Sequence, residues 1–303
     1  MVPTFPSFDS RTLTVDGVNI HYFCGGTGSP LVLVHGLGSS AAVEFYFNLE
    51  PLAANHHVLA IDLPGFGHSD KPVQDYTIEL FVKAVRELMV CENLERAAVM
   101  GVSMGGRVAV GLALESPEMV ERLILVDALG VGAPRAVLAY RVLLTRGLGE
   151  LTLSGTARAL RRMNPKVIRR FWAWYLRRPG SVDKILSDER IADHGALLAK
   201  PEYRAAYLSA LRSIAGMRTL RNNIVVQDRL KELRMPTLLI WGRHDHIFPA
   251  AHAVAAAGDL TDGRVEIFDD SGHTPQMEEP ERFNRVVLDF LKQPIGRRGE
   301  GVA

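Results

Sequence analysis

The chain has 303 residues, 47% of them hydrophobic and 23% charged, and its formal net charge is +1. This length suits one large α/β domain with an insertion, or two ordinary domains, and either can bury a sizeable core. So small a net charge creates no field that would draw the protein to nucleic acid or to a membrane. No apolar run approaches the ~18 residues of a membrane span, and no signal peptide is visible, so we expect a soluble, cytoplasmic protein.

Short apolar runs alternate with helical patterns along most of the chain. Runs on either side of Asp16-Gly17 predict an N-terminal hairpin, and Thr77 fits the N-cap of the helix that follows it. The predicted strands cover residues 12–15, 20–24, 31–34, 57–61, 97–102, 123–126, 237–241 and 265–268, and the predicted helices cover 77–90, 104–114 and 280–291. Continuous apolar strands separated by helices indicate an α/β fold whose mainly parallel sheet is covered on both faces.

The alternation stops between about residues 128 and 233, where the pattern is helical and rich in arginine. We therefore predict a helical cap at 128–233, inserted in an α/β core formed by 1–127 and 234–303. Within the cap, the aromatic segment 171–175 lies between arginine pairs at 161–162 and 177–178. This stretch fits an amphipathic cap helix with its aromatic residues packed inward. The alternatives are a clamp for an anionic substrate and an interfacial helix that contacts lipid.

The two cysteines, Cys24 and Cys91, are too few for a disulfide framework and lack the spacing of metal ligands. We expect both to be buried structural thiols.

A candidate nucleophile stands in Gly101-Val102-Ser103-Met104-Gly105, which matches G-x-S-x-G at a predicted strand-to-helix junction. That junction is the context the pattern requires, because a serine on such a turn projects its hydroxyl from the edge of the sheet. The small neighbours allow strand and helix to approach closely. The helix that begins at Met104 points its first N–H groups at any anion formed there. The alternative is a glycine-rich turn with an incidental serine.

A serine hydroxyl needs a base, and the base needs a third group to orient it. Asp245 follows the predicted strand 237–241, and His273 follows the strand 265–268. All three residues thus stand just past parallel strands, at the edge where such sheets place their sites. The histidines flanking Asp245 share its loop and are weaker candidates for the base. Asp269 and Asp270 precede His273 too closely to orient its far nitrogen.

The segment His35-Gly36-Leu37-Gly38 ends the predicted strand 31–34. The backbone N–H groups of Leu37 and Met104 are the candidate oxyanion hole, because fixed donors stabilise the charge of a tetrahedral intermediate. We expect His35 to be a structural histidine that pins this loop. The turn at 62–69 is interpreted as structural too.

Five segments together resemble the α/β-hydrolase superfamily over residues 11–292: HGLG at 35–38, DLPGFGHSD at 62–70, GVSMGG at 101–106, GRHD at 242–245 and GHTPQMEEP at 272–280. The resemblance implies an eight-stranded sheet, a cap over the site, and acyl-enzyme chemistry at Ser103 with His273 as base and Asp245 as its orienting acid. It also implies that no cofactor or metal takes part.

The substrate class follows less directly from these motifs. Ser103 stands where haloalkane dehalogenases and epoxide hydrolases have aspartate, which argues against both. Meta-cleavage C–C hydrolases are similar in GxSMGG and in their helical cap, but typically have asparagine at the position of Val102 and tryptophan at that of Thr274. We therefore expect a lipase-like carboxylesterase acting on a small-molecule ester, with a C–C bond hydrolase of meta-cleavage products or a lactonase as alternatives. A ligand-binding receptor on the same fold is the non-enzyme alternative, which the intact triad disfavours.

Overall fold

The computed structural model describes residues 4–132, 140–160, 162, 166–169, 195–217, 220–221 and 223–294. Eight strands form one sheet in the order β1-β2-β4-β3-β5-β6-β7-β8. The β1–β2 and β2–β4 pairs are antiparallel and all other neighbours are parallel. The predicted α/β-hydrolase fold is thus confirmed. The strands are β1 Phe8–Val15, β2 Val18–Gly25, β3 Ser29–Val34, β4 His56–Ile61, β5 Ala97–Val102, β6 Val120–Val126, β7 Thr237–Gly242 and β8 Gly263–Phe268.

Helices follow most of the strands, and the three predicted ones are present. Thr77 caps α3 as expected, because its side chain accepts a hydrogen bond from the Leu80 N–H at 3.3 Å. The α-helices are α1 Ala41–Glu44, α2 Leu49–Ala53, α3 Ile78–Cys91, α4 Met104–Glu115, α5 Arg141–Leu144, α6 Leu148–Leu160, α10 Pro201–Ile214, α11 Ala251–Asp259, α12 Pro275–Glu278 and α13 Pro280–Lys292, with 3₁₀ turns at Pro117–Met119 and Gln227–Glu232.

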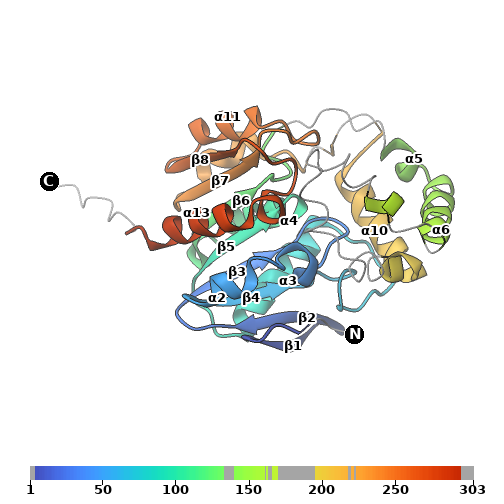
Figure 1. Cartoon of the computed structure of the whole chain (residues 1–303), viewed down its shortest axis with the longest axis horizontal. Coiled ribbons are helices and arrows are strands. Elements are labelled where there is room, and N and C mark those ends of the chain that lie inside the picture. Colours follow the sequence, from blue (N-terminus) through green and yellow to red (C-terminus); the bar gives the residue numbers. More distant parts are fainter. Residues whose placement is uncertain are drawn as a thin grey trace, which may run out of the picture.

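The central strands are apolar on both faces because helices cover both. In β3, Val32 and Val34 pack in the core on the side of α3, α4 and α11. The alternate residues Leu31 and Leu33 pack in a second core with α2 and α13. Figure 1 shows α2 and α13 over the near face of the sheet. Two-sided burial explains why these strands appear in the sequence as unbroken apolar runs.

The expectation of two buried thiols is half right, because Cys24 is buried but Cys91 is exposed. The buried face of α3 includes Phe81, Val85 and Leu88, which recur at helical spacing. Cys91 is the last residue of this helix, and its side chain is exposed to solvent.

A helical region is inserted between β6 and β7. Its helices α5, α6 and α10 lie together at one end of the molecule, on the right in Figure 1. The aromatic and arginine-rich segment 171–178 lies outside the described residues, so the orientation expected for it stays a prediction. Among the described residues, no helix combines the length and the apolar character that crossing a membrane requires.

Candidate active site

Ser103 occupies a strained turn between β5 and α4, with a positive φ of 52°. Three backbone hydrogen bonds hold it there. Its N–H donates to the Val126 carbonyl at 2.9 Å, and its carbonyl accepts from the N–H groups of Gly106 at 3.0 Å and Leu129 at 2.9 Å. A non-glycine residue adopts this conformation only where its surroundings enforce it, which is typical of functional sites.

The glycines around Ser103 bring helix α4 against the sheet, as the sequence predicts. A Cβ atom on Gly101 would lie 2.2 Å from the Gly105 carbonyl oxygen, and one on Gly105 would lie 2.1 Å from the carbonyl oxygen of Val34. Both clashes are with backbone, so no side chain could move to relieve them. The close approach places the first N–H groups of α4, which have no partner within the helix, beside the Ser103 hydroxyl.

The three residues proposed from the sequence meet at the carboxyl edge of the sheet. His273 Nε2 lies 3.1 Å from Ser103 Oγ, and His273 Nδ1 lies 2.8 Å from Asp245 Oδ2. Asp245 and His273 are both buried, whereas Ser103 is half-buried. A hydroxyl, an imidazole and a carboxylate linked in this order can pass a proton from the hydroxyl to the imidazole.

The charges at the site favour that direction of proton transfer. Burial opposes ionisation of Asp245, but His273 and the N–H groups of Ile247 and Phe248, at 2.7 Å and 3.0 Å from Oδ1, hold its pKa below the ordinary value. Burial also opposes the charged form of His273 and so lowers its pKa. The Asp245 carboxylate outweighs this effect, and the pKa of His273 is raised overall. His273 is therefore a stronger base than an isolated imidazole.

Glu44 orients the loop that contains Leu37. Its buried carboxylate accepts hydrogen bonds from the Gly36 N–H at 3.2 Å and from the Gln276 side chain at 2.7 Å. A Cβ on Gly36 would lie 3.3 Å from the Ser103 Cβ, so the loop runs directly beside the serine. From the inserted region, the Tyr203 hydroxyl donates to the Gly38 carbonyl at 2.5 Å.

A second buried acid, Glu278, shapes the loop that carries His273. It accepts hydrogen bonds from the Gly272 N–H at 3.0 Å and from the Thr274 N–H and hydroxyl, each at 3.1 Å. These bonds fix the backbone on both sides of the histidine. Sequence reasoning missed Glu44 and Glu278. The Gln276 partner of Glu44 is 232 positions away, whereas the Glu278 partners lie four and six residues before it in the segment 272–280.

Asp127, at the end of β6, is a third acid that the sequence analysis did not single out. It is fully buried, its φ is 41°, and Oδ1 accepts a hydrogen bond from the Gly242 N–H at 3.0 Å. Asp127, Asp245 and His273 each place one nitrogen or oxygen within 4.8 Å of the other two. Burial and the charge of Asp245 raise the pKa of Asp127 well above its usual value, which favours the protonated form of this acid. Its place after a parallel strand was the available signal.

The competing residues lie apart from this arrangement. The side chains of His244, His246, Asp269 and Asp270 are exposed. His35 is buried and has the expected structural contacts, since its Nδ1–H donates to the Gly36 carbonyl at 2.7 Å and its Nε2 accepts from the Leu63 N–H at 3.0 Å. Both ring nitrogens are thus engaged, Nδ1 within the loop after β3 and Nε2 in joining that loop to the one after β4.

Comparisons with known proteins agree with this architecture. Residues 29–280 match the family model described as alpha/beta hydrolase fold. The chain is 30% identical to 2-hydroxy-6-oxo-6-phenylhexa-2,4-dienoate hydrolase of Comamonas testosteroni over 282 residues, 90% of this chain and 91% of the relative. It is 31% identical to a 2-hydroxy-6-oxononadienedioate/2-hydroxy-6-oxononatrienedioate hydrolase of Cupriavidus pinatubonensis over 93% of this chain and 95% of the relative.

A solved structure supports the same assignment at the level of the fold. The 2-hydroxy-6-oxo-6-phenylhexa-2,4-dienoate hydrolase of Rhodococcus sp. strain RHA1 is similar with a TM-score of 0.78 at 22% identity, covering 94% of this chain and 99% of that one. The family match and the two curated relatives each extend over most of the chain. The chain therefore belongs to the α/β-hydrolase fold family.

Proposed function

We propose that this protein is a serine hydrolase that cleaves a carbon–carbon bond beside a ketone, with Ser103 as nucleophile, His273 as base and Asp245 as the acid that orients it. The hydrogen-bonded chain from Ser103 through His273 to Asp245 carries the serine mechanism. The choice of bond rests on relatives named as dienoate hydrolases, which are 30–31% identical over at least 90% of this chain. This choice places the C–C hydrolase ahead of the carboxylesterase expected from sequence motifs.

In the first step, Ser103 Oγ attacks the ketone carbon while its proton moves to His273 Nε2. The oxyanion that forms is held by the backbone N–H groups of Leu37 and Met104, which complete the site in this proposal. One such donor is worth about 2.7–4 kcal/mol in the transition state. Asp245 stabilises the imidazolium without taking its proton.

The second step breaks the carbon–carbon bond, and its electron pair leaves with the departing carbon. A carbon leaving group is accessible only when that pair is delocalised. The dienol meets this condition once its 2-hydroxyl proton has moved to the carbon beside the ketone, because that carbon is then conjugated through the remaining double bond to the new carbonyl. His273 returns its proton to the departing fragment. Water activated by His273 then releases the acyl group from Ser103 as a carboxylic acid.

Ester hydrolysis is the second candidate, and two residues favour it. The asparagine typical of meta-cleavage hydrolases is replaced by Val102, which is buried in the core. The tryptophan typical of meta-cleavage hydrolases is replaced by Thr274, whose hydroxyl donates a hydrogen bond to Glu278. The acyl-enzyme chemistry is the same for both candidates, since only the leaving group differs.

The test compares 2-hydroxy-6-oxo-6-phenylhexa-2,4-dienoate with p-nitrophenyl esters of short to long acyl chains. Wild type is assayed beside Ser103→Ala, with Ser29→Ala as the matched control because Ser29 is exposed at the start of β3. We expect Ser103→Ala to lose at least about 10³-fold in kcat, and Ser29→Ala to match wild type. A higher kcat/KM on the dienoate supports C–C cleavage, and a higher value on an ester replaces it with the second candidate. Wild-type turnover of neither substrate, or equal turnover by Ser103→Ala, refutes the mechanism.

A further inference from the structure

A second cluster of reactive side chains lies far from Ser103, where β2, β4 and α3 meet. Cys24 belongs to β2 and is paired with Leu59 of β4. His57 lies two residues before Leu59, so its side chain is on the same face of the sheet, diagonal to Cys24. Glu92 directly follows α3, which packs on that face. His57 is near the amino end of β4, whereas Ser103 follows the carboxyl end of β5, so the two sites lie at opposite edges of the sheet.

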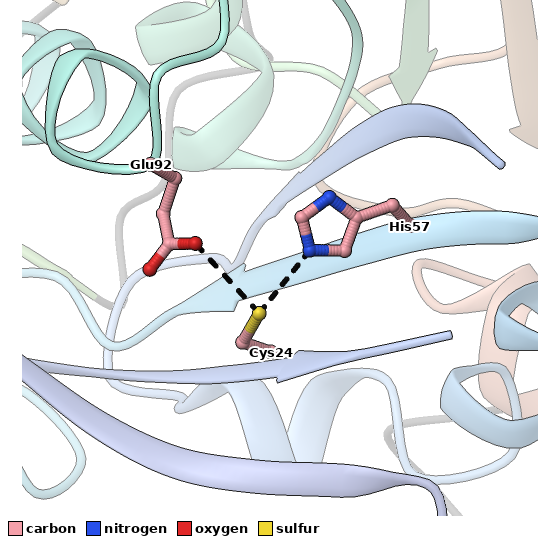
Figure 2. Close-up of side chains that lie close together, drawn as sticks. All are labelled: Cys24, His57 and Glu92. Carbon is pink, nitrogen blue, oxygen red and sulfur yellow. Dashed lines mark hydrogen bonds between the residues drawn. The ribbon is translucent and has the colours of Figure 1, made fainter. Parts of the chain in front are cut away.

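The three side chains converge, and each places one potential ligand atom within 4.8 Å of those of the other two. His57 Nε2 lies 3.2 Å from Cys24 Sγ, and Glu92 Oε2 lies 4.0 Å from the same sulfur. Figure 2 shows the imidazole and the carboxylate approaching the sulfur from different sides. In tetrahedral Zn²⁺ sites, bonds of ~2.3 Å to sulfur and ~2.0–2.1 Å to nitrogen and oxygen place ligand atoms about 3.3–3.6 Å apart. The Glu92 oxygen would have to move about 0.4–0.7 Å closer to the sulfur to reach that spacing.

Neighbouring groups fix the Glu92 carboxylate with one oxygen turned toward the sulfur. The Tyr22 hydroxyl donates to Oε1, and Arg11 contacts both oxygens at 3.3 Å. Arg11 also pairs with Asp9 at 3.2 Å, which offsets its positive charge. A divalent cation bound by a thiolate and by Glu92 would leave the site neutral, so the arginine does not exclude it.

The orientation of the acid distinguishes a metal site from a nucleophilic one. In a cysteine–histidine–acid triad, the acid contacts the histidine nitrogen that faces away from the sulfur. Here Glu92 approaches Cys24 instead, on the side of the sulfur left open by His57. Two potential ligands directed at one sulfur suit a shared cation better than proton transfer.

Solvent reaches this cluster through a cavity of about 340 Å³ whose lining includes Asp9, Arg11, Cys24 and His57. An ion can therefore enter without disruption of the sheet. Three protein ligands leave a fourth position, which a water molecule from the cavity can fill.

We propose that Cys24, His57 and Glu92 form a binding site for a divalent transition-metal ion of the zinc class, separate from the hydrolase site. Cys24 binds as the thiolate and releases its proton to solvent. The mixture of sulfur, nitrogen and oxygen ligands suits Zn²⁺ and Co²⁺, and disfavours Mg²⁺ and Ca²⁺, which prefer oxygen ligands alone. The ion would join two strands to the end of α3.

The test is a titration of chelator-treated, reduced full-length protein with Co²⁺, followed by absorbance. We expect a saturable thiolate-to-cobalt charge-transfer band in the near ultraviolet, with one ion per chain, that Zn²⁺ abolishes by displacement. Cys24→Ser removes the band, and His57→Ala and Glu92→Gln each weaken binding at least about tenfold. Cys91→Ser is the matched control, because Cys91 is exposed and precedes Glu92 directly. Both Cys91→Ser and Ser103→Ala keep the wild-type band.

The proposal is refuted if wild type gives no saturable band, or if the band survives Cys24→Ser or disappears in Cys91→Ser. Near-ultraviolet circular dichroism reports whether each variant is folded. Should Cys24→Ser fail to fold, alkylation of the native wild-type protein with iodoacetamide decides the question. Zn²⁺ should then protect Cys24 while Cys91 is modified, and equal modification of Cys24 with and without Zn²⁺ contradicts the site.

Discussion

Replacing Asp245 by asparagine tests the proposed mechanism through the tautomer of one histidine. Asp245 Oδ1 accepts hydrogen bonds from the N–H groups of Ile247 and Phe248 at 2.7 Å and 3.0 Å. The carbonyl oxygen of asparagine must keep that place, because its amino group cannot accept. The amino group then faces His273 Nδ1, which becomes an acceptor and shifts the ring proton to Nε2. In that tautomer His273 cannot take the proton of Ser103.

The expected loss in kcat is about 10⁴-fold, as for the same exchange in other Ser-His-Asp sites. This corresponds to about 5.4 kcal/mol of transition-state stabilisation, at about 1.36 kcal/mol for each factor of ten. The size of the asparagine side chain and its bonds to the loop are retained, so we expect the stability of the fold to change little. The measurement is kcat on whichever substrate wild type prefers, beside a denaturant unfolding curve for each variant.

Two aspartate-to-asparagine controls interpret the result. Asp270→Asn, in the loop of His273 but exposed, should retain wild-type kcat. Asp127→Asn should also retain it, since burial and the Asp245 charge favour the neutral form of Asp127, which asparagine resembles. Activity in Asp245→Asn within about tenfold of wild type would refute the assigned role of Asp245. If adding Asp127→Asn then abolished that activity, Asp127 would be the orienting acid.

Two further predictions concern pH and packing. Burial lowers the pKa of His273, but Asp245 raises it by more, so kcat/KM should fall as pH drops through a value above about 6.5. In Asp245→Asn this loss of activity should occur at lower pH. A measured pH profile with the same acid limb in both proteins would contradict the assignment. Gly105→Ala would place a Cβ 2.1 Å from the Val34 carbonyl oxygen and should cost about 3 kcal/mol of unfolding free energy in urea. Gly155→Ala is the control for this change, because Gly155 lies in helix α6 with open space around it. Alanine there should stabilise the fold by up to about 1 kcal/mol. Equal losses of unfolding free energy in both variants would refute the packing argument.

The sequence was sufficient for the sheet and for the three residues that meet at its edge. Buried parallel strands appear as continuous apolar runs, and Ser103, Asp245 and His273 each stand just past one of them. Each of these signals lies within a few neighbouring residues, so it can be recognised in a single sequence. The alanine-rich helix α11 was missed, because it has no charged face to give the segment a helical period.

The role of Glu44 could not be predicted because one of its partners is distant in the chain. The contact between Glu44 and Gln276 joins residues 232 positions apart, and no pattern near either residue indicates it. The prediction of the substrate class was limited for a different reason, because two kinds of sequence evidence disagree. The differences at Val102 and Thr274 pointed toward esters, whereas identity over at least 90% of the chain points toward dienoate hydrolases.

The hydrogen bond from Tyr203 to the Gly38 carbonyl has a consequence for engineering this protein. On the other side of Ser103, Arg107 of α4 donates to the carbonyls of Asn223 and Ile224 at 2.9 Å and 3.0 Å. The inserted segments are thus hydrogen-bonded both to the loop after β3 and to helix α4, which lie on either side of Ser103. Exchanging them for those of a relative, as a way to change substrate range, would also alter the rate of bond cleavage unless a tyrosine and the two carbonyls were retained.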